Sequence, residues 1–174
     1  MKRLLTVFAF LLTFGLLATP QAQAQVTFEV GPRLGIDVGD VEELFIGADA
    51  RISSAGFPLI INPTFDYYFT DDPLTFWSLS ANALYPFVAD NAAFTPYAGA
   101  GIGLYRSSVD DIEVFGQTVE GDSVTDIGLN LIFGAQFLNT GPVSPFAEAQ
   151  YSSVFSDGDT GNLFSIKGGV LFGF

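Results

Sequence analysis

The side chains that could carry chemistry in this chain are of few types. Its 174 residues include no His and no Cys, which excludes His-based triads, thiol nucleophiles, His metal ligands and disulfides. A pair of carboxylates can hydrolyse a glycoside, but the acids that the pattern places together have basic partners and no obvious cleft. The sequence therefore predicts no enzymatic activity, no catalytic residue, no metal site and no cofactor.

Eight charged residues form the most specific constellation, because each lies on the polar side of a segment that alternates apolar and polar residues. They are Glu29, Arg33, Asp37, Asp49, Arg51, Asp66, Glu148 and Lys167. Charges that leave water must be paired. Acids and bases that interleave in this way predict a network of ion pairs inside the fold.

The segments that position these residues have a period of two. They are 26–38, 44–53, 58–70, 75–87, 95–107, 125–138, 145–154 and 163–174. That period belongs to β-strands rather than helices, and most segments reach the roughly 9–11 residues of a tilted membrane strand. Pro63 lies inside the third segment, where its missing N–H predicts a bulge or irregular pairing.

The first 24 residues have the order of a secretory signal peptide. Lys2 and Arg3 precede the apolar stretch 4–17, and Ala22-Gln23-Ala24 is a small-x-small cleavage site. We expect a mature domain of residues 25–174, with 4 of the 6 basic residues left against 19 acidic ones and a net charge of −15. This balance excludes ordinary nucleic-acid binding, which needs Lys and Arg at the phosphates.

A single all-β domain, a transmembrane antiparallel up-and-down barrel of about eight strands, reconciles this acidity with a hydrophobic composition. Lipid then covers one face of each strand, while the acids lie in loops. If the N-terminus is periplasmic, the outer loops are 39–43, 71–74, 107–124 and 155–162, and they hold 12 of the 19 acids. Aromatic residues near strand ends would form the two interfacial girdles. Those residues are Phe69, Trp77, Tyr105, Phe137, Phe146 and Phe172.

In such a barrel the eight charges face the lumen. A first hairpin centred near residue 41 places Arg33 opposite Asp49, and the last hairpin places Lys167 diagonally from Glu148. Two interpretations follow: a plug of salt bridges that stabilises a narrow interior, or a narrow path that favours cations, because five acids face three bases. Glycines 99, 101 and 103 alternate with apolar residues inside one strand, so we expect them to make room for bulky neighbours rather than bind a nucleotide.

Two segments resemble a known group of proteins. Phe94-Thr95-Pro96-Tyr97-Ala98-Gly99-Ala100-Gly101-Ile102-Gly103 is similar to the Pro-Tyr-x-Gly-x-Gly-x-Gly strand of small outer-membrane barrels, the OmpA-like, OmpX-like and OmpW-like group. The last segment, with Phe172 and the terminal Phe174, resembles the signal that this group presents to the barrel assembly machinery. The resemblance implies a bacterial outer-membrane location and identifies no function, since the group is functionally mixed. Enzymes among outer-membrane barrels use His, which this chain lacks.

We therefore predict a non-enzymatic outer-membrane barrel, structural or surface-interacting, most simply a monomer, with membrane lipid and the assembly machinery as partners. The alternatives are the narrow pore and a carrier of small hydrophobic ligands, either in the membrane or as a secreted soluble barrel. A soluble barrel would leave Leu131, Phe133 and Ile166 uncovered. The loop acids Asp110, Asp111 and Glu113, with Asp157 and Asp159, raise the alternative of a divalent-cation site. Neither group has EF-hand spacing, so a solvated anionic surface is the favoured interpretation.

Overall fold

A computed structural model describes residues 26–87, 93–114, 117–137, 143–156 and 158–174. The predicted signal peptide, residues 1–24, lies outside these ranges and remains a prediction. The described ranges contain ten strands: β1 (Val26–Asp37), β2 (Leu44–Ser54), β3 (Phe57–Tyr68), β4 (Leu74–Pro86), β5 (Phe94–Val109), β6 (Ile112–Val114), β7 (Gln117–Val119), β8 (Ser123–Phe137), β9 (Val143–Ser156) and β10 (Asp159–Gly173). No helix within the described ranges is long and apolar enough to cross a bilayer.

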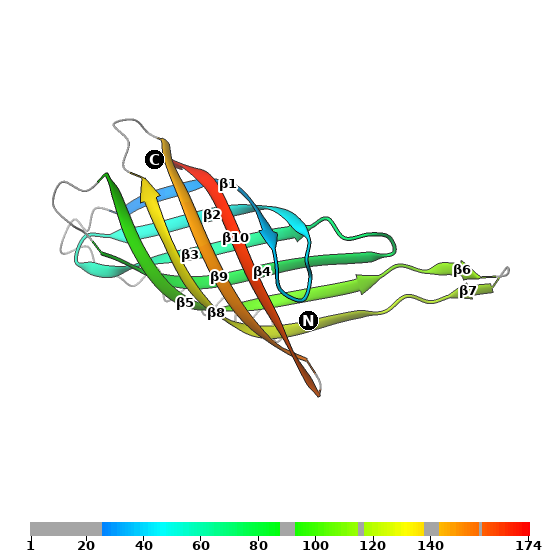
Figure 1. The fold of residues 1–174 in the computed structure, drawn as a ribbon. Helices are drawn as coiled ribbons and strands as arrows, with labels where there is room; N and C mark the ends of the chain where they lie inside the picture. Colours follow the sequence, from blue (N-terminus) through cyan, green and yellow to red (C-terminus); the bar gives the residue numbers. More distant parts are fainter. Residues whose placement is uncertain (1–25, 88–92, 115–116, 138–142, 157) are drawn as a thin grey trace, which may run out of the picture.

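Eight of these strands close into an antiparallel barrel in the order β1-β10-β9-β8-β5-β4-β3-β2 (Figure 1). This confirms the predicted fold class and all eight predicted strands. The main differences lie at the loop ends, where β5, β8, β9 and β10 extend two to four residues beyond the predicted bounds. The last hairpin is correspondingly tight, since Ser156 already pairs with Asp159.

The longest predicted loop, 107–124, contains regular structure. Its central part forms the separate two-stranded sheet β6–β7, which projects beyond the barrel in Figure 1. The segments 54–57, 88–94 and 139–144 connect strands at the opposite end of the barrel, where β1 starts and β10 ends. We call these two ends the loop end and the turn end. The up-and-down topology that the sequence predicted is present, and the longest connection, which carries β6–β7, lies at the loop end.

The two faces of the sheet differ in the way that the period of two requires. Outward-facing apolar side chains are exposed, with Leu34 at 69 % and Phe133 at 67 % exposure. Inward-facing residues are mostly polar and buried, among them Asn62, Asn82, Asn130 and Ser152. This is the reverse of a water-soluble domain, in which the apolar side chains would be inside.

The irregular pairing expected at Pro63 is present, because β2 and β3 form no pair between Asp49–Thr64 and Ile52–Ile61. The β2–β3 register is the same on both sides of Pro63 and shifts only between Ile52 and Ser54, next to the turn. Ala50 faces Pro63 in this register, and the Asn62 side-chain amide donates to the Ala50 carbonyl oxygen at 2.9 Å. The amide thus supplies the donor that a proline nitrogen lacks, and the ladder resumes in the same register at the Ile52–Ile61 pair.

Aromatic pairs mark both ends of the outer surface. Phe65–Trp77 and Tyr67–Phe69 lie toward the loop end, whereas Tyr85–Phe87, Phe94–Phe137 and Phe28–Phe174 lie toward the turn end. The girdle prediction was wrong for two residues, because Tyr105 and Phe146 are both 3 % exposed and face the lumen. Both residues were assigned to a girdle because they lie near strand ends. Whether a side chain faces lipid or the lumen depends instead on its place in the alternation along the strand.

Candidate functional site: the buried ionic cluster

Arg33 on β1 joins the first three strands from inside the lumen. Its Nε and one terminal nitrogen donate to the two carboxylate oxygens of Asp66 at 2.7 and 2.5 Å, and its other terminal nitrogen lies 3.3 Å from Asp49 Oδ2. The Asp66 contact has the parallel two-bond geometry that suits a guanidinium and a carboxylate. Because all three side chains are at most 5 % exposed, this pairing replaces the water that each charge has lost.

Arg51 on β2 connects that group to the far side of the barrel. It donates to Asp49 at 3.2 Å, to the Gln136 side-chain oxygen at 3.0 Å and to the Tyr97 hydroxyl at 2.9 Å. Its guanidinium also lies near the rings of Tyr97 and Phe146, 4.7 Å from each centroid. Stacking of this kind suits Arg better than Lys.

Glu148 on β9 receives contacts from both sides. The Tyr97 hydroxyl donates to its Oε2 at 3.0 Å, and Lys167 Nζ on β10 lies 3.2 Å from its Oε1. Lys167 also donates to the Gln150 side-chain oxygen at 2.5 Å. We call Arg33, Asp49, Arg51, Asp66, Glu148 and Lys167 the ionic cluster.

Two predicted pairings were wrong in register. The first hairpin centres one residue earlier than expected, so Arg33 is opposite Gly47, and Asp49 is opposite Gly31. Arg33 reaches Asp49 diagonally instead. In the last hairpin Lys167 is directly opposite Glu148 rather than diagonal to it. The period of two determines which face of the sheet a residue occupies. The register between two strands depends instead on the geometry of the turn, and the predicted centre of the first hairpin was one residue too late.

The other two predicted charges do not belong to the ionic cluster. Glu29 is half-buried near the turn end, where it accepts from the Gln136 amide at 3.0 Å. Asp37 is fully buried near the loop end, where its carboxylate accepts from the Gly39 and Val41 backbone N–H groups and from the Ser165 hydroxyl. The ionic cluster therefore holds three bases and three acids, and the acidic surplus inferred from the sequence lies outside it.

Sequence reasoning did not find the neutral side chains that link these charges. Asn62 donates to Asp49 at 2.9 Å, Asn130 donates to Asn82 at 3.1 Å, and the Tyr105 hydroxyl donates to Asn130 at 2.7 Å. Tyr97 was named only within the Pro-Tyr-x-Gly segment and given no role, although its hydroxyl bridges Arg51 and Glu148. A usable signal was present, since each of these residues occupies an inward position at which an uncharged polar group must find a partner.

Glycines on the inner face make room for these large side chains, as predicted for 99, 101 and 103. A Cβ on Gly99 would contact the Leu84 side chain at 2.5 Å, and one on Gly103 would lie 2.7 Å from the Tyr105 ring. A Cβ on Gly101 would collide with the Asn82 side chain. Small residues therefore alternate with bulky ones so that a narrow lumen can be filled.

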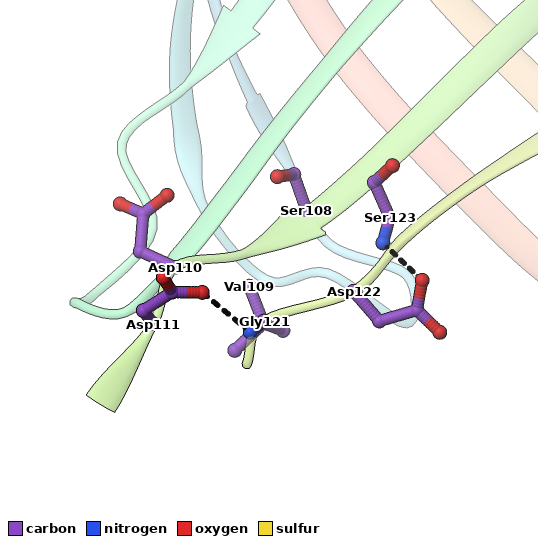
Figure 2. Close-up of a pocket in the computed structure, with 7 residues that line it drawn as sticks. All are labelled: Ser108, Val109, Asp110, Asp111, Gly121, Asp122 and Ser123. Atoms are coloured by element: carbon purple, nitrogen blue, oxygen red, sulfur yellow. Dashed lines mark hydrogen bonds between the residues drawn. The ribbon is translucent and has the colours of Figure 1, made fainter. Parts of the chain in front are cut away.

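The acids at the base of the β6–β7 hairpin do not converge. Asp110, Asp111 and Asp122 line a shallow pocket (Figure 2), but Asp111 accepts from the Gly121 backbone N–H and Asp122 from the Ser123 backbone N–H, both at 2.7 Å. Across the part of the chain that the structure describes, no group of three or more acidic residues could hold a metal ion. Asp157 and the Glu113 side chain lie outside that part.

The fold is that of a small outer-membrane β-barrel. Neisserial surface protein A superimposes with a TM-score of 0.61 at 19 % identity, over 86 % of this chain and 97 % of its own. The N-terminal barrel domain of Pseudomonas aeruginosa OprF gives 0.62 at 17 % identity, over 87 % and 100 %. A major outer membrane protein of Thermus thermophilus gives 0.64 at 11 % identity, over 86 % and 99 %. No protein-family model and no curated protein sequence matches the chain.

Proposed function

We propose that this chain is a non-enzymatic protein of the bacterial outer membrane, with a structural or surface-interacting role and a lumen plugged by the ionic cluster. The observation that carries the proposal is the inverted distribution of side chains. An exposed apolar surface runs round the whole barrel, and a buried set of charges fills its interior. Lipid is the environment that suits such a surface, and a closed barrel leaves no strand edge unpaired within it.

The contacts of the buried acids support a structural role rather than catalysis. Asp49, Asp66 and Glu148 each lie within an ion pair, and each is at most 4 % exposed. An acid or base in catalysis must reach a substrate, whereas these carboxylates are engaged by Arg33, Arg51 and Lys167 and shielded from solvent. The cluster connects five barrel strands with Tyr97 of a sixth, which is the arrangement that a plug needs.

A narrow cation path is the second candidate, and the distribution of charge weighs against it. Selectivity of that kind needs uncompensated acids along the path. The ionic cluster is balanced, and the two surplus acids, Glu29 and Asp37, lie on either side of it with uncharged partners. A carrier of hydrophobic ligands has less support, because the apolar inward residues, among them Leu84, Ile132 and Leu171, are fully buried.

The last strand supports the proposed assembly signal. Phe174 is 81 % exposed beside Phe28, and its backbone N–H donates to the Phe28 carbonyl at 2.9 Å. Phe172 is also outward-facing. Exposed aromatic groups at the end of the closing strand are accessible to an assembly factor before the barrel forms, and to lipid afterwards. We propose that the folded protein is a monomer.

Two measurements test this function. Full-length protein expressed in a Gram-negative host should be found in the outer-membrane fraction, resist extraction by urea and require detergent for solubility. Recovery as a soluble periplasmic protein would overturn the proposal. Purified barrel in planar bilayers should carry no steady single-channel current, with an open porin of known conductance as the positive control. A reproducible cation-selective current would instead favour the pore.

A further inference from the structure

Large side chains close the lumen at the loop end, on the outer side of the ionic cluster. Six barrel strands contribute one inward residue each to what we call the loop-end layer: Phe45, Tyr68, Phe76, Tyr105, Val154 and Leu163. All are buried except Phe76, which is partly buried and packs against the others. Four of the six are aromatic, and none carries a charge.

The rings of this layer are continuous from strand to strand. The Phe45 and Tyr68 centroids are 4.9 Å apart, those of Tyr68 and Phe76 4.8 Å, and those of Phe76 and Tyr105 6.4 Å. The remaining two strands provide glycines against which the rings pack. A Cβ on Gly35 of β1 would lie 2.5 Å from the Phe45 ring, and one on Gly128 of β8 would lie 2.8 Å from the Tyr105 ring. All eight barrel strands therefore contribute to closing the cross-section.

The two sides of the ionic cluster differ. Toward the loop end, buried serines, including Ser152 and Ser165, lie one inward position below Val154 and Leu163, so the loop-end layer separates them from the outside. Toward the turn end, the hydrogen bonds continue from Arg51 through Gln136 to the half-buried Glu29. The polar interior thus extends toward the turn end beside the buried Leu84 and Ile132. Toward the loop end it meets the apolar layer, where the buried charge is Asp37, which is capped by Gly39, Val41 and Ser165.

We propose that the loop-end layer, and not the ionic cluster, is the seal that keeps ions and solutes out of the lumen from the outer side. The inference rests on the proposed function and divides the plug into two parts. The ionic cluster fills the middle of the lumen and joins the strands, whereas the loop-end layer excludes ions and solutes. An apolar constriction excludes hydrated ions because water does not wet it. A balanced set of ion pairs offers polar partners to water, so it joins strands without forming such a boundary.

The chain has no cysteine, so a single thiol can report access to the lumen. Ser152→Cys places a thiol of similar size beneath the layer, at a position that is 1 % exposed. The probe is a small charged methanethiosulfonate, applied to folded protein in detergent micelles. We expect Ser152→Cys alone to be protected, and Ser123→Cys, at an exposed site at the loop end, to react in every background as the positive control.

A seal formed by the loop-end layer and a seal formed by the ionic cluster predict opposite results when a second substitution is added to Ser152→Cys. Phe45→Ala leaves a ring-sized void in the layer, so Ser152→Cys should react at least about tenfold faster in that background. Arg33→Ala breaks the ionic cluster and leaves the layer intact, so the thiol should stay protected. Reaction of Ser152→Cys alone, or in the Arg33→Ala background, would overturn the proposal. Continued protection in both Phe45→Ala and Phe45→Ala/Tyr105→Ala would overturn it as well.

Folding is verified for each variant by the shift in electrophoretic mobility between unheated and heated samples. If the Phe45→Ala pair does not fold, Leu163→Ala with Ser165→Cys tests the same layer from β10 and is judged by the same outcomes. Outer-membrane location is measured separately, by fractionation. A failed seal in a protein that still reaches the outer membrane would therefore reject this inference and leave the proposed function standing.

Discussion

Removing the Lys167 ammonium should destabilise the barrel without preventing its export. Lys167 and Glu148 are 1 % and 0 % exposed, and Lys167 Nζ is 3.2 Å from Glu148 Oε1, which has no hydrogen-bond partner among the described residues. Loss of one member of a buried pair typically costs about 3–5 kcal/mol. Glu148 Oε2 keeps its Tyr97 hydrogen bond, so we expect Lys167→Ala to lie near the lower value, about 3 kcal/mol.

The assay is urea unfolding of barrels refolded into lipid vesicles. Trp77 is the only tryptophan of the chain, and it lies on the outer surface, so its fluorescence reports transfer from lipid to water. With a urea dependence of about 1–3 kcal/mol per molar, the midpoint should fall by about 1–3 M. The matched control is Glu148→Gln/Lys167→Met, which removes both charges and should recover most of the loss.

An unchanged midpoint for Lys167→Ala would refute the reasoning, because it would mean that the Glu148 carboxylate does not depend on its ammonium partner. A double variant less stable than the single one would also contradict it. In that case the Glu148 carboxylate would be stabilising without Lys167, through Arg51, whose nearest nitrogen lies 3.9 Å from Glu148 Oε2.

Three further outcomes are expected. Phe174→Ser should lower the amount of barrel assembled in the outer membrane of cells, measured by fractionation, while refolding into vesicles in vitro stays close to that of the unchanged protein. Gly31→Ala should cost about 1–3 kcal/mol or more in urea unfolding, because its Cβ would collide with the Val170 carbonyl of the closing strand, whereas Gly173→Ala, with nothing within 4 Å, should have no effect. Tyr97→Phe removes the hydroxyl that links the two sides of the ionic cluster and should cost about 1.5–3 kcal/mol in the same assay; equal stability would show that the link is dispensable.

The fold could be predicted from the sequence because each strand carries its own signal. Alternation over 26–38 or 125–138 determines which residues face lipid, and no distant contact is needed to read it. Features that depend on a turn were less accessible. The one-residue error in the first hairpin moved Arg33 from opposite Asp49 to opposite Gly47, and the β6–β7 sheet was taken for an unstructured loop.

The chemistry of the interior was predictable only in part. The eight charges could be assigned to the inner face by parity, but their partition into a balanced cluster, a half-buried Glu29 and a separately capped Asp37 depends on contacts between strands far apart in sequence. Tyr105 shows the same limit. Its position near a strand end favours a place at the membrane interface, yet it packs in the loop-end layer because its ring fits over Gly128.

The order of charges along the chain has a consequence for how the barrel can be built. Strands β1 to β3 bring Arg33, Asp49, Arg51 and Asp66, which sum to zero, and the final hairpin brings Glu148 and Lys167, which also sum to zero. Each end of the polypeptide can therefore approach the bilayer with its ionic-cluster charges already compensated by near neighbours. Closure between β1 and β10 then merges two neutral halves, so the last step of folding transfers no uncompensated cluster charge out of water.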